Sequence, residues 1–138
     1  MKPNTHVVGT SNKWLWAGRV VSALPALPAL GLLFSAIMKL MKPPAVLQGF
    51  THFGYPQNLI VAIALLELGS TIFYLIPRVS VLGAILMTGY LGGATATNVR
   101  IGDPSFVITL TLGVLVWFGL YLRDERLRAL IPLRNRRA

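Results

Sequence analysis

Six residues in this largely apolar sequence have side chains that could bind a ligand or move a proton. They are Glu67, His52, Asn98, Arg100, Asp103 and Tyr90. Glu67 is the most informative, because it is the one acidic residue inside an apolar segment long enough to cross a membrane. An ionisable group at that depth costs roughly 3 kcal/mol on insertion scales, so it normally faces protein or water. We therefore predict a proton, cation or ligand site at Glu67; a hydrogen bond to Ser70, Thr71 or a threonine of the next segment is the alternative.

The charge state of Glu67 should follow from its depth. Midway along a helix over 59–76, the carboxyl would lie about 12–14 Å from either end, beyond the reach of so short a side chain. Desolvation favours the neutral form, and no basic residue lies at that depth in the expected spans. We expect Glu67 to be largely protonated and to face the segment 80–97, in a pocket open to the outer side.

The remaining candidates lie near the expected membrane surface or carry aromatic rings. The spacing of Arg100 and Asp103 predicts a local ion pair and a cap for the next helix, and contact of Arg100 with an anionic headgroup is the alternative. His52 has only His6 as a second histidine, so no metal site is expected. Tyr90 could donate a hydrogen bond to a quinone headgroup, although aromatic residues in membrane helices more often serve packing.

Composition places the chain in a membrane. Of its 138 residues, 54% are hydrophobic and only 12% are charged, whereas soluble domains carry about 25% charged residues. Because one span needs roughly 20 apolar residues, the length allows about four. The absence of cysteine excludes thiol catalysis and cysteine-ligated clusters. The net charge of +9 lies mainly outside the apolar runs, which favours anionic lipid headgroups over nucleic acid as the partner.

The hydropathy pattern predicts a single all-α domain over 1–138, a bundle of four transmembrane helices. The expected spans are 19–38, 59–76, 80–97 and 106–122, followed by a basic tail over 123–138. Pro25 and Pro28 predict a kink in the first span. Pro43 and Pro44 end that span, and the residues after them suit a short interfacial helix between helices one and two.

Small residues in 80–97 predict where this helix packs. Gly89 and Gly93 lie four residues apart on one face, and Gly92 starts a second small pair with Ala96. In lipid, close approach of two backbones supplies much of the attraction between helices. We expect Gly89, Gly92 and Gly93 to contact neighbouring helices, with 80–97 at the centre of the bundle.

The distribution of basic residues predicts the orientation. With four spans, ten of the 13 basic residues fall on the side of both termini, and only Lys39, Lys42 and Arg100 fall on the other. The positive-inside rule then places both termini in the cytoplasm. The expected location is the bacterial inner membrane.

Four motifs make the chain resemble the DoxX-like family of small bacterial membrane proteins. They are FSAIMKLMKPPAVLQGFTHFGYP, ELGSTIFYLIPR, VLGAILMTGYLGGATATNVRIGDP and GLYLRDERLRALIPLR. The resemblance implies four helices and, for some members, subunits linked to thiosulfate:quinone oxidoreduction and to membrane oxidoreductase complexes. Similar sequences usually carry histidine where this chain has Asn98. An amide does not titrate, so the departure argues against a proton-coupled role for that position.

The function expected from the resemblance is an accessory or scaffolding subunit linked to redox or quinone metabolism, with a small-ligand or quinone cleft open to the outer side. An oxidoreductase subunit and a second copy of the chain are the expected protein partners. Two alternatives stay open: a small homodimeric transporter or channel centred on Glu67, and an enzyme acting on a lipid-soluble substrate near His52 and Arg100. The sequence contains no Ser-His-Asp order, phosphate loop or zinc motif, and we assign no catalytic residue.

Overall fold

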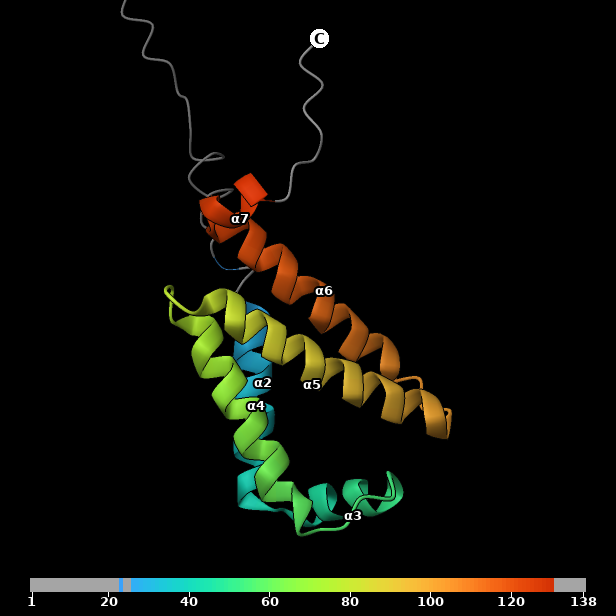
Figure 1. Ribbon diagram of the computed structural model, residues 1–138. Coiled ribbons are helices and arrows are strands. Elements are labelled where there is room, and N and C mark those ends of the chain that lie inside the picture. The colour runs from blue at the N-terminus through green and yellow to red at the C-terminus, as the bar shows by residue number, and fades with distance from the viewer. Residues whose placement is uncertain (1–22, 24–25, 131–138) are drawn as a thin grey trace, which may run out of the picture.

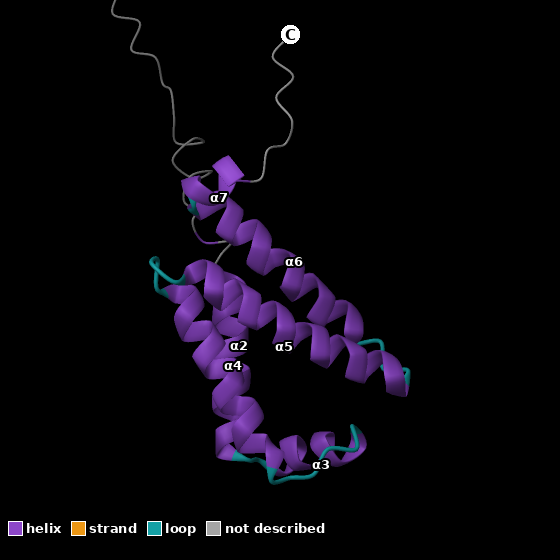
Figure 2. Cartoon of the chain, in the orientation of Figure 1, coloured by secondary structure: helices purple, strands orange, loops and turns teal. Residues whose placement is uncertain are grey.

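The computed structural model describes residue 23 and residues 26–130, and within this part of the chain every regular element is a helix (Figures 1 and 2). The helices are α2 (Ala26–Met41), α3 (Pro44–His52), α4 (Leu59–Leu75), α5 (Ser80–Ile101), α6 (Phe106–Arg123) and α7 (Glu125–Leu130). The all-α prediction is therefore confirmed. Residues 19–22, 24 and 25 of the expected first span, including Pro25, lie outside the described residues.

The helices pack in an order that follows the chain. α2 packs on α4, α4 on α5 and α5 on α6, with a smaller contact between α2 and α6. In Figure 1 the α2–α4 pair and the α5–α6 pair lie close together at the end where α7 begins, and they diverge toward the end where α3 lies. α3 lies at this diverging end, beside the ends of α2 and α4 (Figure 1).

The break between α2 and α3 has a local cause. Proline cannot donate a helical hydrogen bond, and it disfavours helical backbone in the residue before it. Lys42, directly before Pro43, has a left-handed φ of +50°. The axes of α2 and α3 meet at 99°. The short helix expected after Pro43–Pro44 is present. Pro28 lies in the first turn of α2, where a missing N–H costs little.

Two of the described helices are long and apolar enough to cross a membrane: α5 with 22 residues and α6 with 18. The bent α2–α3 pair passes the same criteria as one broken span, and α4 is a shorter apolar helix of 17 residues. Large apolar side chains cover the outside, including Phe34 on α2 and Ile108 on α6, which are 66% and 63% exposed. Such a surface suits lipid as the surrounding solvent.

α5 continues further than the sequence predicts. The expected span ended at residue 97 and left Asn98 and Arg100 in a loop, whereas the helix runs to Ile101. Its end is a Schellman motif, in which Gly102 adopts φ +71° and Asp103 N–H donates to Asn98 O at 2.9 Å. The left-handed residue, not the first polar one, ends the helix, so Asn98 and Arg100 are helical.

The closest helix contact involves a different glycine from those predicted. A Cβ atom built on Gly83 of α5 would lie 2.1 Å from the backbone nitrogen of Tyr74 on α4. A Cβ built on Gly89, Gly92 or Gly93 would meet no described atom within 4 Å. Close backbone approach between α4 and α5 therefore occurs near the Pro77 turn, and the other three glycines border open space.

Tyr74 also ties α4 to α6. Its ring is fully buried, and its hydroxyl donates to Val116 O at 3.0 Å. Arg123 Nη2 donates to Tyr74 O at 2.8 Å, and the guanidinium carbon lies 5.1 Å from the centre of the ring. These contacts hold α4 and α6 together at the end of the bundle where α7 begins. The helix pairs separate at the opposite end, near α3.

Candidate functional site

The inward face of α4 places Glu67 inside the bundle. Its buried residues recur at helical spacing, at Ile60, Ala64, Glu67, Thr71 and Tyr74. Glu67 belongs to this buried row and is only 1% exposed. The expectation that Glu67 faces protein rather than lipid therefore holds within the described chain.

The partner of Glu67 is Lys39. Lys39 Nζ lies 2.8 Å from Glu67 Oε2 and donates a second hydrogen bond, of 2.5 Å, to Ser35 Oγ one turn earlier on α2. Side chains of a helix lean toward its N-terminus, so a lysine in the last turn of α2 points back into the bundle. The largely protonated Glu67 expected from the sequence is thus replaced by an ion pair between α2 and α4.

Lys39 was not predicted as a site residue, because the expected first span ended at residue 38. The helix in fact runs to Met41, which places Lys39 inside its last turn. The available signal was the pair Ser35 and Lys39, four residues apart on one helical face. A lysine stem of four carbons can then reach the depth of the carboxylate.

The second carboxylate oxygen of Glu67 has no hydrogen-bond partner among the described residues. The phenol of Tyr90 on α5 neighbours the carboxylate, but it makes no hydrogen bond of good geometry to Oε1. The ring of Tyr90 also lies near the ammonium group, with 5.9 Å between Lys39 Nζ and the ring centre. Glu67, Lys39 and Tyr90 thus form one polar cluster from three helices.

This cluster lines a cavity of about 500 Å³ between the diverging helix pairs. Small-molecule sites in proteins typically measure about 300–1,000 Å³. The walls come from α2, α3, α4, α5 and α6 and include Ser35, Phe50, Tyr55 and Asn98. Gly89 and Gly93 also line the cavity. Because glycine has no side chain, these two positions leave room for a ligand.

Three of the six predicted site residues meet here. Glu67, Tyr90 and Asn98 line the cavity, and Asn98 is only 6% exposed. Arg100 does not line the cavity, but its Nη2 donates to the backbone oxygen of Phe53, a lining residue, at 2.6 Å. Beside it, the Tyr55 and Thr97 hydroxyls share a hydrogen bond of 2.8 Å. These two contacts fasten the segment after α3 to the end of α5, so α3 closes one side of the cavity.

His52 and Asp103 lie apart from the cavity. His52 is exposed at the end of α3, with its ring 5.8 Å from that of Phe53. Asp103 forms no ion pair with Arg100 within 4 Å; it accepts a hydrogen bond of 2.8 Å from Ser105 N–H. Hydrogen bonds from the Ser105 side chain and backbone hold the pKa of the Asp103 carboxyl below its ordinary value. Asp103 thus acts as the expected turn residue before α6, without the expected ion pair.

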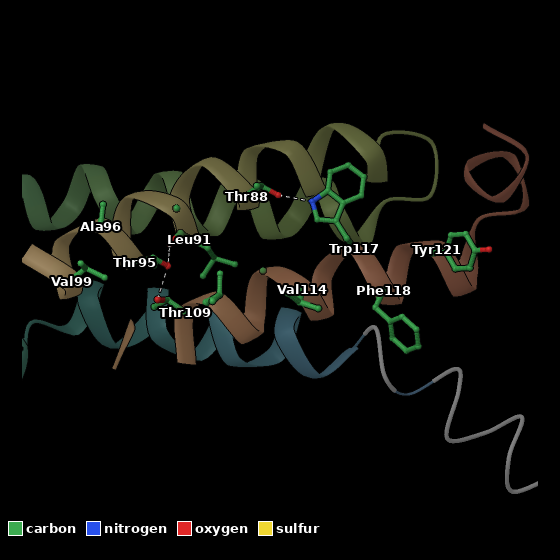
Figure 3. A pocket seen from close by; sticks show the side chains of 13 residues that line it. Thr88, Leu91, Thr95, Ala96, Val99, Thr109, Val114, Trp117, Phe118 and Tyr121 are labelled. Carbon is green, nitrogen blue, oxygen red and sulfur yellow. Dashed lines mark hydrogen bonds between the residues drawn. The ribbon is translucent and has the colours of Figure 1, made fainter. Parts of the chain in front are cut away.

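A second, larger groove of about 910 Å³ runs between α5 and α6 (Figure 3). Its lining is almost entirely apolar and includes Gly92, Val114 and Phe118. Four of its polar side chains bond to one another, because Thr95 bonds to Thr109 and Trp117 Nε1 donates to Thr88 Oγ1, each at 2.8 Å. This groove therefore lacks the charged groups of the Glu67 cavity. Over the described residues, no group of three or more His, Cys, Asp or Glu side chains could hold a metal ion.

Long apolar helices, a lipid-compatible exterior and a buried ion pair beside a cavity define a small helical membrane-associated protein. The sequence model of the DoxX-like family matches residues 23–119, which is more than half of the chain. The protein therefore belongs to the DoxX-like family, and the resemblance seen in its motifs is confirmed. The matched region contains all the residues named for the cavity. No curated protein and no solved structure matches the chain.

Proposed function

We propose that this protein is a four-span protein of the bacterial inner membrane that serves redox metabolism as an accessory subunit and holds a quinone-type ligand in the Glu67 cavity. The observation that carries the proposal is the cavity itself, which combines apolar and aromatic walls with a buried ion pair. Intramembrane ionisable residues usually mark a functional site. Buried pockets with a few converging polar groups are typical of small-molecule sites.

The chemistry of the lining suits a quinone. Quinone carbonyls accept hydrogen bonds, and the Lys39 ammonium has three N–H donors, of which Ser35 and Glu67 take two. The amide of Asn98 offers a further donor on the same cavity. Phe50, Tyr55 and Tyr90 supply rings against which a planar headgroup can pack.

The arrangement of basic residues supports the proposed orientation. Arg78 in the α4–α5 turn lies at the same end of the bundle as α7, which carries Arg126 and Arg128 (Figure 1). Lys42 and Arg100 lie toward the other end. The first end would face the cytoplasm and its anionic headgroups, and the cavity near α3 would then open toward the outer side.

A small homodimeric transporter is the second candidate, and the Lys39–Glu67 pair favours it specifically. A proton or a cation that binds Glu67 would weaken the ion pair and loosen α2 from α4. Such a site could couple ligand binding to a change in helix packing. This function requires that Glu67 release Lys39 during each cycle, whereas a quinone-holding subunit keeps the pair intact.

Binding of a short-chain benzoquinone to the full chain in nanodiscs tests the proposal. We expect saturable binding that weakens about tenfold in Asn98→Leu, because a donor to the headgroup is lost. Val114→Ala, in the α5–α6 groove, is the matched control and should bind like the unmodified protein. Flux of protons or cations through proteoliposomes without quinone binding would support the transporter instead. Mass spectrometry of the gently purified protein should reveal bound quinone and any associated oxidoreductase subunit.

A further inference from the structure

Glu67 presents an unused acceptor to the cavity. Its side chain is 1% exposed, and Oε2 is held by Lys39. Oε1 accepts no hydrogen bond from any described residue. An ionised carboxylate can only accept hydrogen bonds, and a buried acceptor without a donor is unfavourable. The group that completes this site must therefore bring an O–H or N–H donor.

The neighbouring protein groups do not fill this role in the described arrangement. The Lys39 ammonium points two of its hydrogens at Ser35 and at Oε2. The Tyr90 phenol neighbours the carboxylate without a well-formed bond to Oε1. A cationic ligand would place a second positive charge beside Lys39, and the pair already neutralises Glu67. The chemistry therefore favours a neutral hydroxyl donor.

We infer that Glu67 Oε1 accepts a hydrogen bond from a ring hydroxyl of the ligand, so that the cavity binds a hydroquinone more tightly than the corresponding quinone. This inference rests on the proposed function, since it names the redox form that the same cavity prefers. The oxidised ring carries two carbonyl acceptors and no donor, so it leaves Oε1 unpaired. The reduced ring supplies the missing hydroxyl hydrogen while its aromatic body fills the same space.

The size of the preference follows from the single hydrogen bond. The difference between a filled and an unfilled buried acceptor corresponds to roughly a tenfold or larger ratio of dissociation constants. Preferential binding of the reduced form raises the midpoint potential of the bound couple. A tenfold ratio shifts a two-electron couple upward by about 30 mV.

Three compounds built on the same ring test the inference on the unmodified full chain in nanodiscs. They are a short-chain benzoquinone, its hydroquinone kept reduced under anaerobic conditions, and the dimethyl ether of that hydroquinone. We expect the hydroquinone to bind about tenfold more tightly than the other two, because only it has a donor. Equal binding of all three would overturn the inference and leave the proposed function standing. Binding of none would overturn the proposed function itself.

Two variants assign the effect to Glu67. The double variant Lys39→Met with Glu67→Leu removes the acceptor without leaving an unpaired charge, and it should bind the hydroquinone and its ether equally. Tyr90→Phe should keep the preference if the ligand supplies the donor to Oε1. A loss of the preference in Tyr90→Phe, or its survival in the double variant, would contradict the assignment. Val114→Ala serves as the control and should retain the full preference.

Discussion

Lys39 Nζ and Glu67 Oε2 lie 2.8 Å apart although the two residues are 28 positions apart in the sequence. The pair joins α2 to α4 at the cavity, and both side chains are largely buried, at 15% and 1% exposure. Removing one partner of a buried pair typically costs about 3–5 kcal/mol, because the other charge is left without compensation. Glu67 is therefore paired with a lysine and not neutral as expected, so substitution of either residue leaves the other charge buried without a partner.

We predict that Glu67→Gln destabilises the protein, because it leaves the Lys39 ammonium unpaired inside the bundle. The double variant Lys39→Met with Glu67→Leu should be more stable than Lys39→Met alone or Glu67→Leu alone, since it removes both charges together. Thermal unfolding in detergent, arranged as a double-mutant cycle, measures the coupling. Additive effects of the two single changes would show that the pair contributes no stability.

Gly83→Ala should be strongly destabilising. The added methyl group would overlap the backbone of Tyr74, at 2.1 Å from its nitrogen and 2.4 Å from its Cα, and neither helix can move without repacking. Overpacking of this kind costs about 1–3 kcal/mol or more. Circular dichroism during heating in detergent measures the loss. Gly92→Ala is the matched control on the same helix, because an added Cβ there meets nothing within 4 Å. Equal stability of the two variants would refute the close contact.

Arg100→Gln should loosen α3 from the end of α5. The guanidinium donates to Phe53 O at 2.6 Å, and a shorter amide cannot maintain that contact. Loss of about 1 kcal/mol would speed local opening roughly fivefold. Hydrogen exchange of the backbone amides over 44–58 measures this opening, and Arg126→Gln in α7 is the control. Unchanged exchange in this segment would mean that Tyr55 and Thr97 hold α3 without Arg100.

Acidification should weaken the turn between α5 and α6. The pKa of Asp103 is held below its ordinary value of 3.8, chiefly by hydrogen bonds from Ser105. Because the pKa of the folded protein is the lower one, the charged form stabilises the fold fully above pH 3.8, and this contribution is lost as the pH falls through the depressed pKa. The unmodified protein should therefore exceed Asp103→Asn in melting temperature near neutral pH. The two melting temperatures should converge only below pH 3.8, as the pH falls through the depressed pKa of Asp103. If the two melting temperatures differ by the same amount at every pH, the charge of Asp103 is not the cause of the difference.

The proposed orientation is testable because the chain contains no cysteine. Single cysteines at Gln48, in α3, and at Asn135, in the basic tail, can be exposed to a membrane-impermeant thiol reagent in intact cells. With cytoplasmic termini, position 48 should react and position 135 should react only after lysis. Labelling of position 135 but not 48 in intact cells would reverse the orientation.

Local features of this protein could be predicted from the sequence because neighbouring residues determine them. Apolar runs predicted the helices, Pro43 and Pro44 predicted the break before α3, and the isolated carboxyl predicted that Glu67 would face the protein. The end of α5 was wrong by four residues, because polarity at Asn98 was taken as the end of the helix. Hydrophobicity alone does not mark where a left-handed residue such as Gly102 stops a helix.

Only the tertiary structure decided which residues meet. α4 and α5 are apolar around most of their circumference, so no polar face in the sequence indicates how each helix is rotated toward its neighbours. That rotation placed Gly83, not Gly93, against α4, and it brought Tyr90 and Asn98 to the cavity of Glu67. The Lys39–Glu67 pair depends in addition on the length of α2 and on how α2 and α4 lie together. Those relations join positions far apart in the chain, and helix packing determines them.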